Sequence, residues 1–181
     1  SLERAQDGFD ARFSAIGRTY RYRVLNRRDA DPFTSSLSWH VPGPLDVDAM
    51  DAAAAHLVGL HDFTSFCRLP TVRPDGTTPT LMRRITLASW RWLDPGLSGI
   101  GLLEFEVSAS AFCHQMVRTM VGTLVDVGNG RLAVDSIPTI LSARDRRASG
   151  EPAPPCGLTF WSVAYPPDAL APPFDETVAG G

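Results

Sequence analysis

The sequence predicts an α+β fold, in which a largely antiparallel sheet has helices packed on one face. Two stretches predict the sheet, because aromatic or aliphatic residues alternate with charged ones over residues 18–25 and 103–107. A period of two with one apolar side is typical of antiparallel strands that bury one face. A third stretch predicts the helical layer, because apolar residues recur at helical spacing over residues 110–128. The 181 residues have the length of one domain with its own core.

The first predicted strand covers residues 18–25. Tyr20, Tyr22 and Val24 are expected on one face, and Arg21 and Arg23 on the other. The tyrosines are expected in the core or at its edge, whereas the two arginines are either solvated or in contact with phosphates.

Further strands are predicted at residues 37–41, 83–92, 103–107 and 158–165. The apolar phase slips within the second of these, which predicts a β-bulge near Ala88 and Ser89. Residues 61–66 are interpreted as a packing turn, and residues 67–82 as a surface loop that carries Arg68 and Arg73.

Three helices are predicted. The first runs from Asp46, its N-cap, to about residue 58. The central one is capped by Ser108 or Ser110 and stops at Gly128. The third covers residues 134–143 and is followed by a basic run of Arg144, Arg146 and Arg147.

The composition is that of an ordinary globular protein, with 44% hydrophobic and 20% charged residues. The formal charge of −3 does not indicate nucleic-acid binding, although all 17 basic residues are arginines. The chain has neither an apolar run long enough to span a membrane nor a signal-peptide pattern. Three widely spaced cysteines predict neither a metal site nor a disulfide framework, which fits a reducing cytoplasm.

One full charge lies inside the apolar central helix, on Arg118, with His114 one turn earlier. A buried guanidinium keeps its proton and therefore needs an anionic partner. The pattern leaves two interpretations open: a structural ion pair, or an active-site arginine that holds a catalytic anion.

Several motifs resemble the C-terminal half of the tRNA pseudouridine synthase A family. They occur in the family's order over residues 9–165 and are Arg12-Phe13-Ser14-Ala15, Tyr20-Arg21-Tyr22, Asp62-Phe63-Thr64-Ser65-Phe66, Ala111-Phe112 with His114 and Met116-Val117-Arg118, Val121-Gly122-Thr123, and Gly157-Leu158. The resemblance implies an enzyme that isomerises uridine to pseudouridine in the anticodon stem-loop of tRNA. It further implies a homodimer in the cytoplasm that uses neither cofactor nor metal.

The resemblance also implies roles for individual residues. Arg118 matches the active-site arginine that pairs with a catalytic aspartate, Tyr20 matches the tyrosine that stacks on the target uracil, and Leu158 matches an apolar residue of the same pocket. Arg12, Arg18 and His114 are predicted to contact the RNA. The wider hypothesis places tRNA affinity on arginines, with Arg21, Arg23, Arg68 and Arg73 as further candidates.

The family's nucleophilic aspartate lies in a Gly-Arg-Thr-Asp-Ala-Gly motif, whereas here Gly17-Arg18-Thr19 is followed by Tyr20. We therefore expect residues 1–165 to be a C-terminal domain with half an active site, and residues 166–181 to be a flexible tail. On its own this chain is expected to be inactive. The competing hypothesis is a catalytically silent module for RNA binding or dimerisation.

Overall fold

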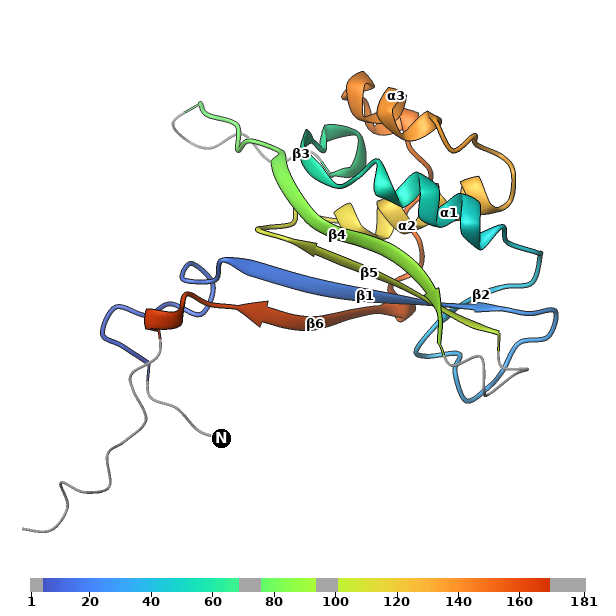
Figure 1. The fold of residues 1–181 in the computed structure, drawn as a ribbon, viewed down its shortest axis with the longest axis horizontal. Helices are drawn as coiled ribbons and strands as arrows, with labels where there is room; N and C mark the ends of the chain where they lie inside the picture. Colours follow the sequence, from blue (N-terminus) through green and yellow to red (C-terminus); the bar gives the residue numbers. More distant parts are fainter. Residues whose placement is uncertain (1–4, 69–75, 94–100, 170–181) are drawn as a thin grey trace, which may run out of the picture.

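The computed structural model describes residues 5–68, 76–93 and 101–169, and confirms the α+β class. Its elements follow the order β1 (Gly17–Asn26), β2 (Trp39–Val41), α1 (Val47–Ala55), β3 (Gly59–Asp62), β4 (Met82–Trp92), β5 (Leu102–Ala109), α2 (Met116–Gly128), α3 (Ser136–Ala143) and β6 (Leu158–Ala164). Short 3₁₀ turns lie at Thr64–Phe66, Arg146–Ala148, Pro155–Gly157 and Pro167–Ala169. The helices lie over one face of the sheet (Figure 1).

The sheet has the strand order β2-β1-β5-β4-β3, and β6 also pairs with β1, so that β1 has three partner strands. The β1–β2 pair is parallel, and the other pairs are antiparallel. In the register, Tyr22 lies opposite Phe105 of β5 and Leu158 of β6. The predicted alternation is confirmed, because Tyr22 and Val24 are fully buried against the helices.

Helix α2 is buried on several sides, as its apolar circumference predicted. Eleven of its 13 residues are buried. The segment 150–153 crosses its outer side, where Gly122 has no room for a Cβ because the carbonyl of Glu151 occupies that space. The segment is fastened by the amide of Gly150, which donates to Thr123 Oγ1 at 3.0 Å. Gly122 therefore allows the chain to lie directly on the helix.

The sheet face opposite the helices carries a ladder of charges. The side chain of Glu104 has no exposed surface, and its carboxylate contacts Arg91 at 2.6 Å, Arg23 at 3.3 Å and Arg21 at 3.5 Å. Glu106 contacts Arg21 at 2.7 Å. The arginines of β1 thus pair with carboxylates of β5. The alternating sequence pattern had left these arginines either solvated or in contact with phosphates.

The start of the central helix was predicted wrongly. Helix α2 begins at Met116, not after Ser108 or Ser110, because Gln115 adopts a left-handed backbone with φ 65°. Residues 110–115 form an irregular segment instead, so His114 precedes the helix. The bulge of β4 lies between Ile85 and Leu87 rather than near Ala88 and Ser89.

Two further features were not predicted. Residues 59–62, partly interpreted as a turn, form the edge strand β3. Cys67 and Cys113, 46 residues apart, are joined by a disulfide with a Cα–Cα distance of 5.9 Å, which contradicts the expectation of unpaired cysteines. Spacing along the chain did not reveal this contact, because the two loops meet only in the folded protein.

Some predictions fall outside the described residues. Arg73 and residues 170–181 of the predicted tail belong to this group, whereas residues 167–169 form a 3₁₀ turn. Within the described part of the chain, no helix has the length and apolarity that crossing a membrane requires.

Candidate active site

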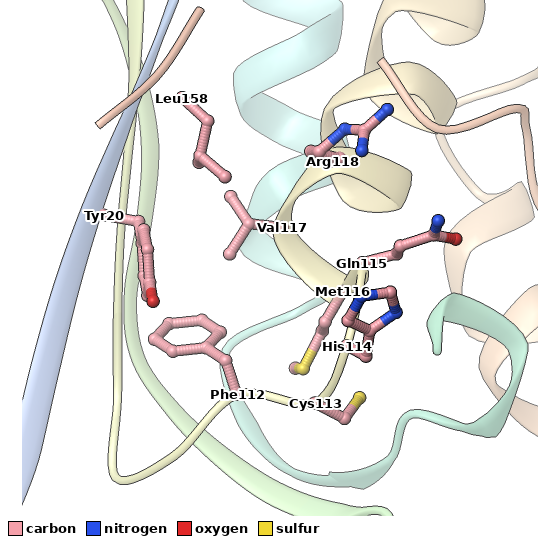
Figure 2. A pocket seen from close by; sticks show the side chains of 9 residues that line it. All are labelled: Tyr20, Phe112, Cys113, His114, Gln115, Met116, Val117, Arg118 and Leu158. Carbon is pink, nitrogen blue, oxygen red and sulfur yellow. The ribbon is translucent and has the colours of Figure 1, made fainter. Parts of the chain in front are cut away.

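A hollow of about 420 Å³ opens between β1, the start of α2 and the first residue of β6. Its lining residues are Tyr20, Phe112, Cys113, His114, Gln115, Met116, Val117, Arg118 and Leu158. Figure 2 shows that Tyr20, Phe112, Val117 and Leu158 form an apolar side, whereas the polar ends of Gln115 and Arg118 point away from Tyr20. The hollow therefore combines an aromatic wall with a cationic rim.

Two aromatic rings hold Tyr20. Phe112 meets its ring edge-on at a centroid distance of 5.1 Å, and Phe160 packs against it at 5.2 Å. Edge and tilted contacts of this kind fix the orientation of a ring. Among the described residues the Tyr20 hydroxyl has no hydrogen-bond partner, so both the ring face and the hydroxyl remain available to a ligand.

Arg118 is half-buried and bonded to the crossing segment. Its Nε–H donates to the carbonyl of Ala153 at 2.6 Å, and the amide of Ala153 donates back to the Arg118 carbonyl at 2.9 Å. No described carboxylate forms an ion pair with it. The guanidinium is thus less buried than predicted, and it keeps donors free for an anion.

Leu158 owes its position to the glycine before it. A Cβ on Gly157 would meet the Tyr22 ring at 2.7 Å and the carbonyl of Arg23 at 2.5 Å. The Tyr22 hydroxyl donates to the carbonyl of Pro154 at 2.6 Å, which ties the same segment to β1. Burial raises the pKa of Tyr22, so this hydroxyl stays protonated. The sequence Gly157-Leu158 thereby brings β6 close to Tyr22 and places Leu158 in the hollow.

The two remaining polar residues of the lining differ in exposure. His114 is exposed, and its carbonyl accepts a hydrogen bond from the amide of Arg68 at 3.0 Å. That bond brings Arg68 to the same edge of the hollow. Gln115 is half-buried and is one of two described residues other than glycine with positive φ. Such backbone geometry concentrates at functional sites.

Arg12 and Arg18 do not line the hollow. Arg18 donates to the carbonyl of Ser110 at 2.7 Å and to that of Arg12 at 2.6 Å, which ties the segment before β1 to the end of β5. Arg12 is exposed, with its guanidinium 5.5 Å from the Phe13 ring centroid. Of the six predicted site residues, the structure therefore gathers Tyr20, His114, Arg118 and Leu158.

Sequence reasoning had not assigned Phe112 and Gln115 to the site. Phe112 was interpreted as part of a helix, although the apolar pattern in front of Met116 belongs to the loop. No sequence signal marks Gln115, because its left-handed backbone depends on the tertiary packing of residues 110–118.

The arrangement suits a planar ring bound against Tyr20 and an anion bound by Arg118. Its volume lies in the range of small-ligand sites, and stacking on one aromatic side chain contributes about 1–3 kcal/mol for a nucleobase. Within the described ranges, no group of three or more histidine, cysteine, aspartate or glutamate side chains is arranged to hold a metal ion.

Comparison with known proteins gives a consistent result. The profile of a family described as tRNA pseudouridine synthase matches residues 53–166. Relatives named tRNA pseudouridine synthase A come from Bacillus velezensis (40% identity, 91% of this chain, 62% of the relative), Leifsonia xyli (43%, 91% and 54%) and Methylobacterium radiotolerans (44%, 92% and 63%). The chain thus spans between 54% and 63% of the length of these relatives.

Proposed function

The chain belongs to the tRNA pseudouridine synthase family, and we propose that its residues 1–165 are the C-terminal domain of an enzyme that isomerises uridine to pseudouridine in the anticodon stem-loop of tRNA. The observation that carries this proposal is the hollow in which Tyr20 and Leu158 form an apolar wall beside a guanidinium without a carboxylate partner in the described chain. A uridine within a stem is out of reach of any pocket, so it has to be flipped out, at roughly a few kcal/mol.

In this proposal each residue has a separate task. Tyr20 stacks on the flipped uracil, and its unpaired hydroxyl takes part in the transfer of the proton at C5 of the uracil. Leu158 forms the wall of the hollow on the side of β6. His114 contacts the RNA at the edge of the hollow.

Arg118 is proposed to pair with the nucleophilic aspartate of the family. The motif that carries this aspartate does not occur in these 181 residues, so the carboxylate has to be supplied by another segment. Pairing lowers the pKa of a carboxyl group and keeps it ionised for attack. The Ala153 carbonyl holds Arg118 through Nε at 2.6 Å, which leaves its terminal nitrogens for the carboxylate.

The test is a pseudouridine assay with unmodified tRNA, in protein that carries the aspartate motif together with these residues. We expect Arg118→Gln to lower kcat/KM by about 10²–10³-fold, in line with removal of one charge-stabilising donor. Arg118→Lys keeps the charge but not the fork of donors and should recover activity in part. The 181 residues alone should form no product, and product above background would place the nucleophile within them.

A catalytically silent module for RNA binding or dimerisation is the second candidate. The absence of an acid beside Arg118 in the described chain favours it. A dimerisation module predicts that Arg118→Gln leaves every function intact, and either module predicts that protein carrying the aspartate motif together with these residues forms no pseudouridine.

We further propose that the enzyme is a homodimer that acts on tRNA in the cytoplasm, as the family resemblance implies. Exposed Phe160 and Trp161 on β6, at 53% and 50% exposure, support a contact with another chain. Light scattering of the purified protein measures the subunit number, and a mass of one subunit would contradict the dimer.

A further inference from the structure

A second hollow, of about 470 Å³, adjoins the first through Gln115, which lines both. Its lining residues are Gln115, Arg146, Arg147, Ser149, Glu151 and Pro152. Arg146 and Arg147 belong to the basic run that follows the third predicted helix. The proposed function leaves this hollow unassigned.

The two arginines of this hollow are in different states. Arg147 is bonded to Asp145 at 2.7 Å, and this hydrogen bond lowers the pKa of Asp145 to about 2. Arg146 is half-buried and forms no ion pair with any carboxylate of the described chain. Within the described ranges its guanidinium donates one hydrogen bond, from Nη1 to Ser149 Oγ at 3.0 Å. A partly desolvated guanidinium without an acid favours an anionic ligand.

Arg146 is also held in place. Ser149 Oγ accepts from Arg146 and donates to the carbonyl of Ser65 at 2.5 Å. The amide of Asp145 donates to Ser65 Oγ at 3.0 Å. Ser65 itself is fully buried. A guanidinium fixed to the core in this way loses less conformational freedom when it binds a ligand.

Gln115 brings an amide to the boundary between the two hollows. Figure 2 shows its side chain and that of Arg118 extending away from Tyr20, on the side opposite the aromatic wall. The left-handed backbone of Gln115 sets this direction, because the residue is the turn that joins the loop to α2. An RNA strand with one base against Tyr20 would therefore leave the first hollow along Gln115.

We propose that the second hollow is an RNA phosphate site, in which Arg146 and Gln115 hold a backbone phosphate next to the flipped nucleotide. The inference rests on the proposed function for the identity of the ligand. The planar guanidinium matches the oxygens of a phosphodiester, and a phosphate contact fixes the register of the strand without reading its sequence. The site thus positions the target base relative to Tyr20.

Substitution of Glu151 is expected to change RNA binding in the direction opposite to substitution of Arg146. It is the one carboxylate among the residues that line this hollow, it is exposed, and it forms no ion pair in the described chain. A negative charge beside an anion site weakens binding. Removal of the charge should therefore strengthen RNA binding, whereas removal of the Arg146 charge should weaken it.

The experiment measures binding of a fluorescent anticodon stem-loop RNA to the protein at several salt concentrations. At moderate salt we expect Arg146→Gln to weaken binding about tenfold, and the slope of log K against log salt to fall by about one. Arg146→Lys should retain the slope but lose part of the affinity. Glu151→Gln should tighten binding about two- to threefold at low salt. Arg131→Gln is the matched control, because Arg131 is exposed, paired with Asp126 and follows the far end of α2.

The outcomes separate this inference from the proposed function. If Arg146→Gln binds as Arg131→Gln does, the phosphate site is overturned, even where the wild-type enzyme forms pseudouridine. If protein carrying the aspartate motif together with these residues forms no pseudouridine but Arg146→Gln still weakens RNA binding, the phosphate site holds and the proposed activity fails. If the wild-type protein does not bind the stem-loop, both are overturned. Circular dichroism of each variant verifies that a weaker complex does not reflect unfolding.

Discussion

Arginines on the two faces of this domain are in opposite electrostatic situations. On the sheet face opposite the helices, the arginines of β1 and β4 form ion pairs with Glu104 and Glu106. Arg118 in the first turn of α2 and Arg146 in the 3₁₀ turn Arg146–Ala148 each line a hollow and have no carboxylate partner in the described chain. The presence of an acid on the neighbouring strand, rather than the number of arginines, therefore separates a structural arginine from one that is available to a ligand.

The salt bridges also reduce the number of arginines that are candidates for binding tRNA. Arg21 and Arg23 were candidates, but both already form ion pairs with the carboxylates of β5. Arg18 is occupied by backbone carbonyls. Arg118 and Arg146 are better placed, because neither forms an ion pair with a carboxylate of the described chain.

The largest expected effect comes from breaking the ladder at its centre. Glu104→Gln removes a fully buried carboxylate from three arginines, and loss of one partner of a buried ion pair costs about 3–5 kcal/mol. The arginines are partly exposed, which places the expected loss at the lower end. Urea unfolding measures it as a shift of the midpoint.

Glu106→Gln is the control, because the Glu106 side chain is 19% exposed and, among the described residues, forms ion pairs only with Arg21 and Arg91. We expect about 1 kcal/mol there. If both variants lost the same unfolding free energy, the burial of Glu104 would add nothing to the stability of the salt bridges.

The next effect tests the segment that holds Arg118. Gly122→Ala places a methyl group on the carbonyl of Glu151, so residues 150–153 have to leave the helix. Overpacking of this kind costs typically 1–3 kcal/mol, and here it also displaces the Ala153 carbonyl from Arg118. We expect a lower unfolding midpoint together with weaker RNA binding.

Gly43→Ala is its matched control, because a Cβ at Gly43 meets nothing within 4 Å. It should change neither measurement. Normal RNA binding by Gly122→Ala would show that Arg118 does not depend on the crossing segment.

Strand β1 contains one tyrosine with a structural contact, Tyr22, and one that lines the hollow, Tyr20. Tyr22→Phe removes a buried hydroxyl that donates to Pro154, and the carbonyl left unpaired costs about 1–2 kcal/mol. Tyr20→Phe should leave stability unchanged and RNA binding intact but slow turnover, whereas Tyr20→Leu should weaken both binding and turnover. Thermal unfolding and the pseudouridine assay distinguish the two tyrosines.

The pH dependence of stability gives Tyr22 a separate signature. Its folded pKa is raised by burial, above the unfolded value of about 10. Its contribution is therefore fully present below pH 10, and is lost above it as the unfolded chain releases the proton, by up to about 1.4 kcal/mol per pH unit. Tyr22→Phe should flatten this decline, and an equally steep decline in the variant would assign it to other groups.

Most of the fold was predictable from local patterns, because the long strands and the helices carry their own periodicity, whereas the short edge strand β3 was missed. The alternation around Tyr22 and Phe105 predicted the central pair of strands, and the apolar circumference of α2 predicted its burial. The positions of Gln115, the bulge after Ile85 and the Cys67–Cys113 contact were missed. Each depends on segments that meet only in three dimensions, and no local propensity encodes them.

The candidate site shows the same division. Tyr20, Arg118 and Leu158 were identified through family motifs, and the structure brings them to one hollow. Residue pattern alone had left Arg118 between two interpretations. The pairing of Arg21 and Arg23 with acids depended on the strand register, which the sequence does not specify.

Only a small stability effect is expected from Arg118→Gln, in contrast to the large loss expected from Glu104→Gln. Arg118→Gln removes one hydrogen bond to the Ala153 carbonyl, and the residue is only half-buried at the edge of a hollow. No carboxylate of the described chain is left unpaired by the change, so the penalty that follows from Glu104→Gln does not arise. We expect the unfolding free energy to fall by about 1 kcal/mol or less, measured in the same urea titration. A loss of 3 kcal/mol or more would mean that Arg118 is a structural cation like those on the sheet face opposite the helices, and would remove it from the proposed active site.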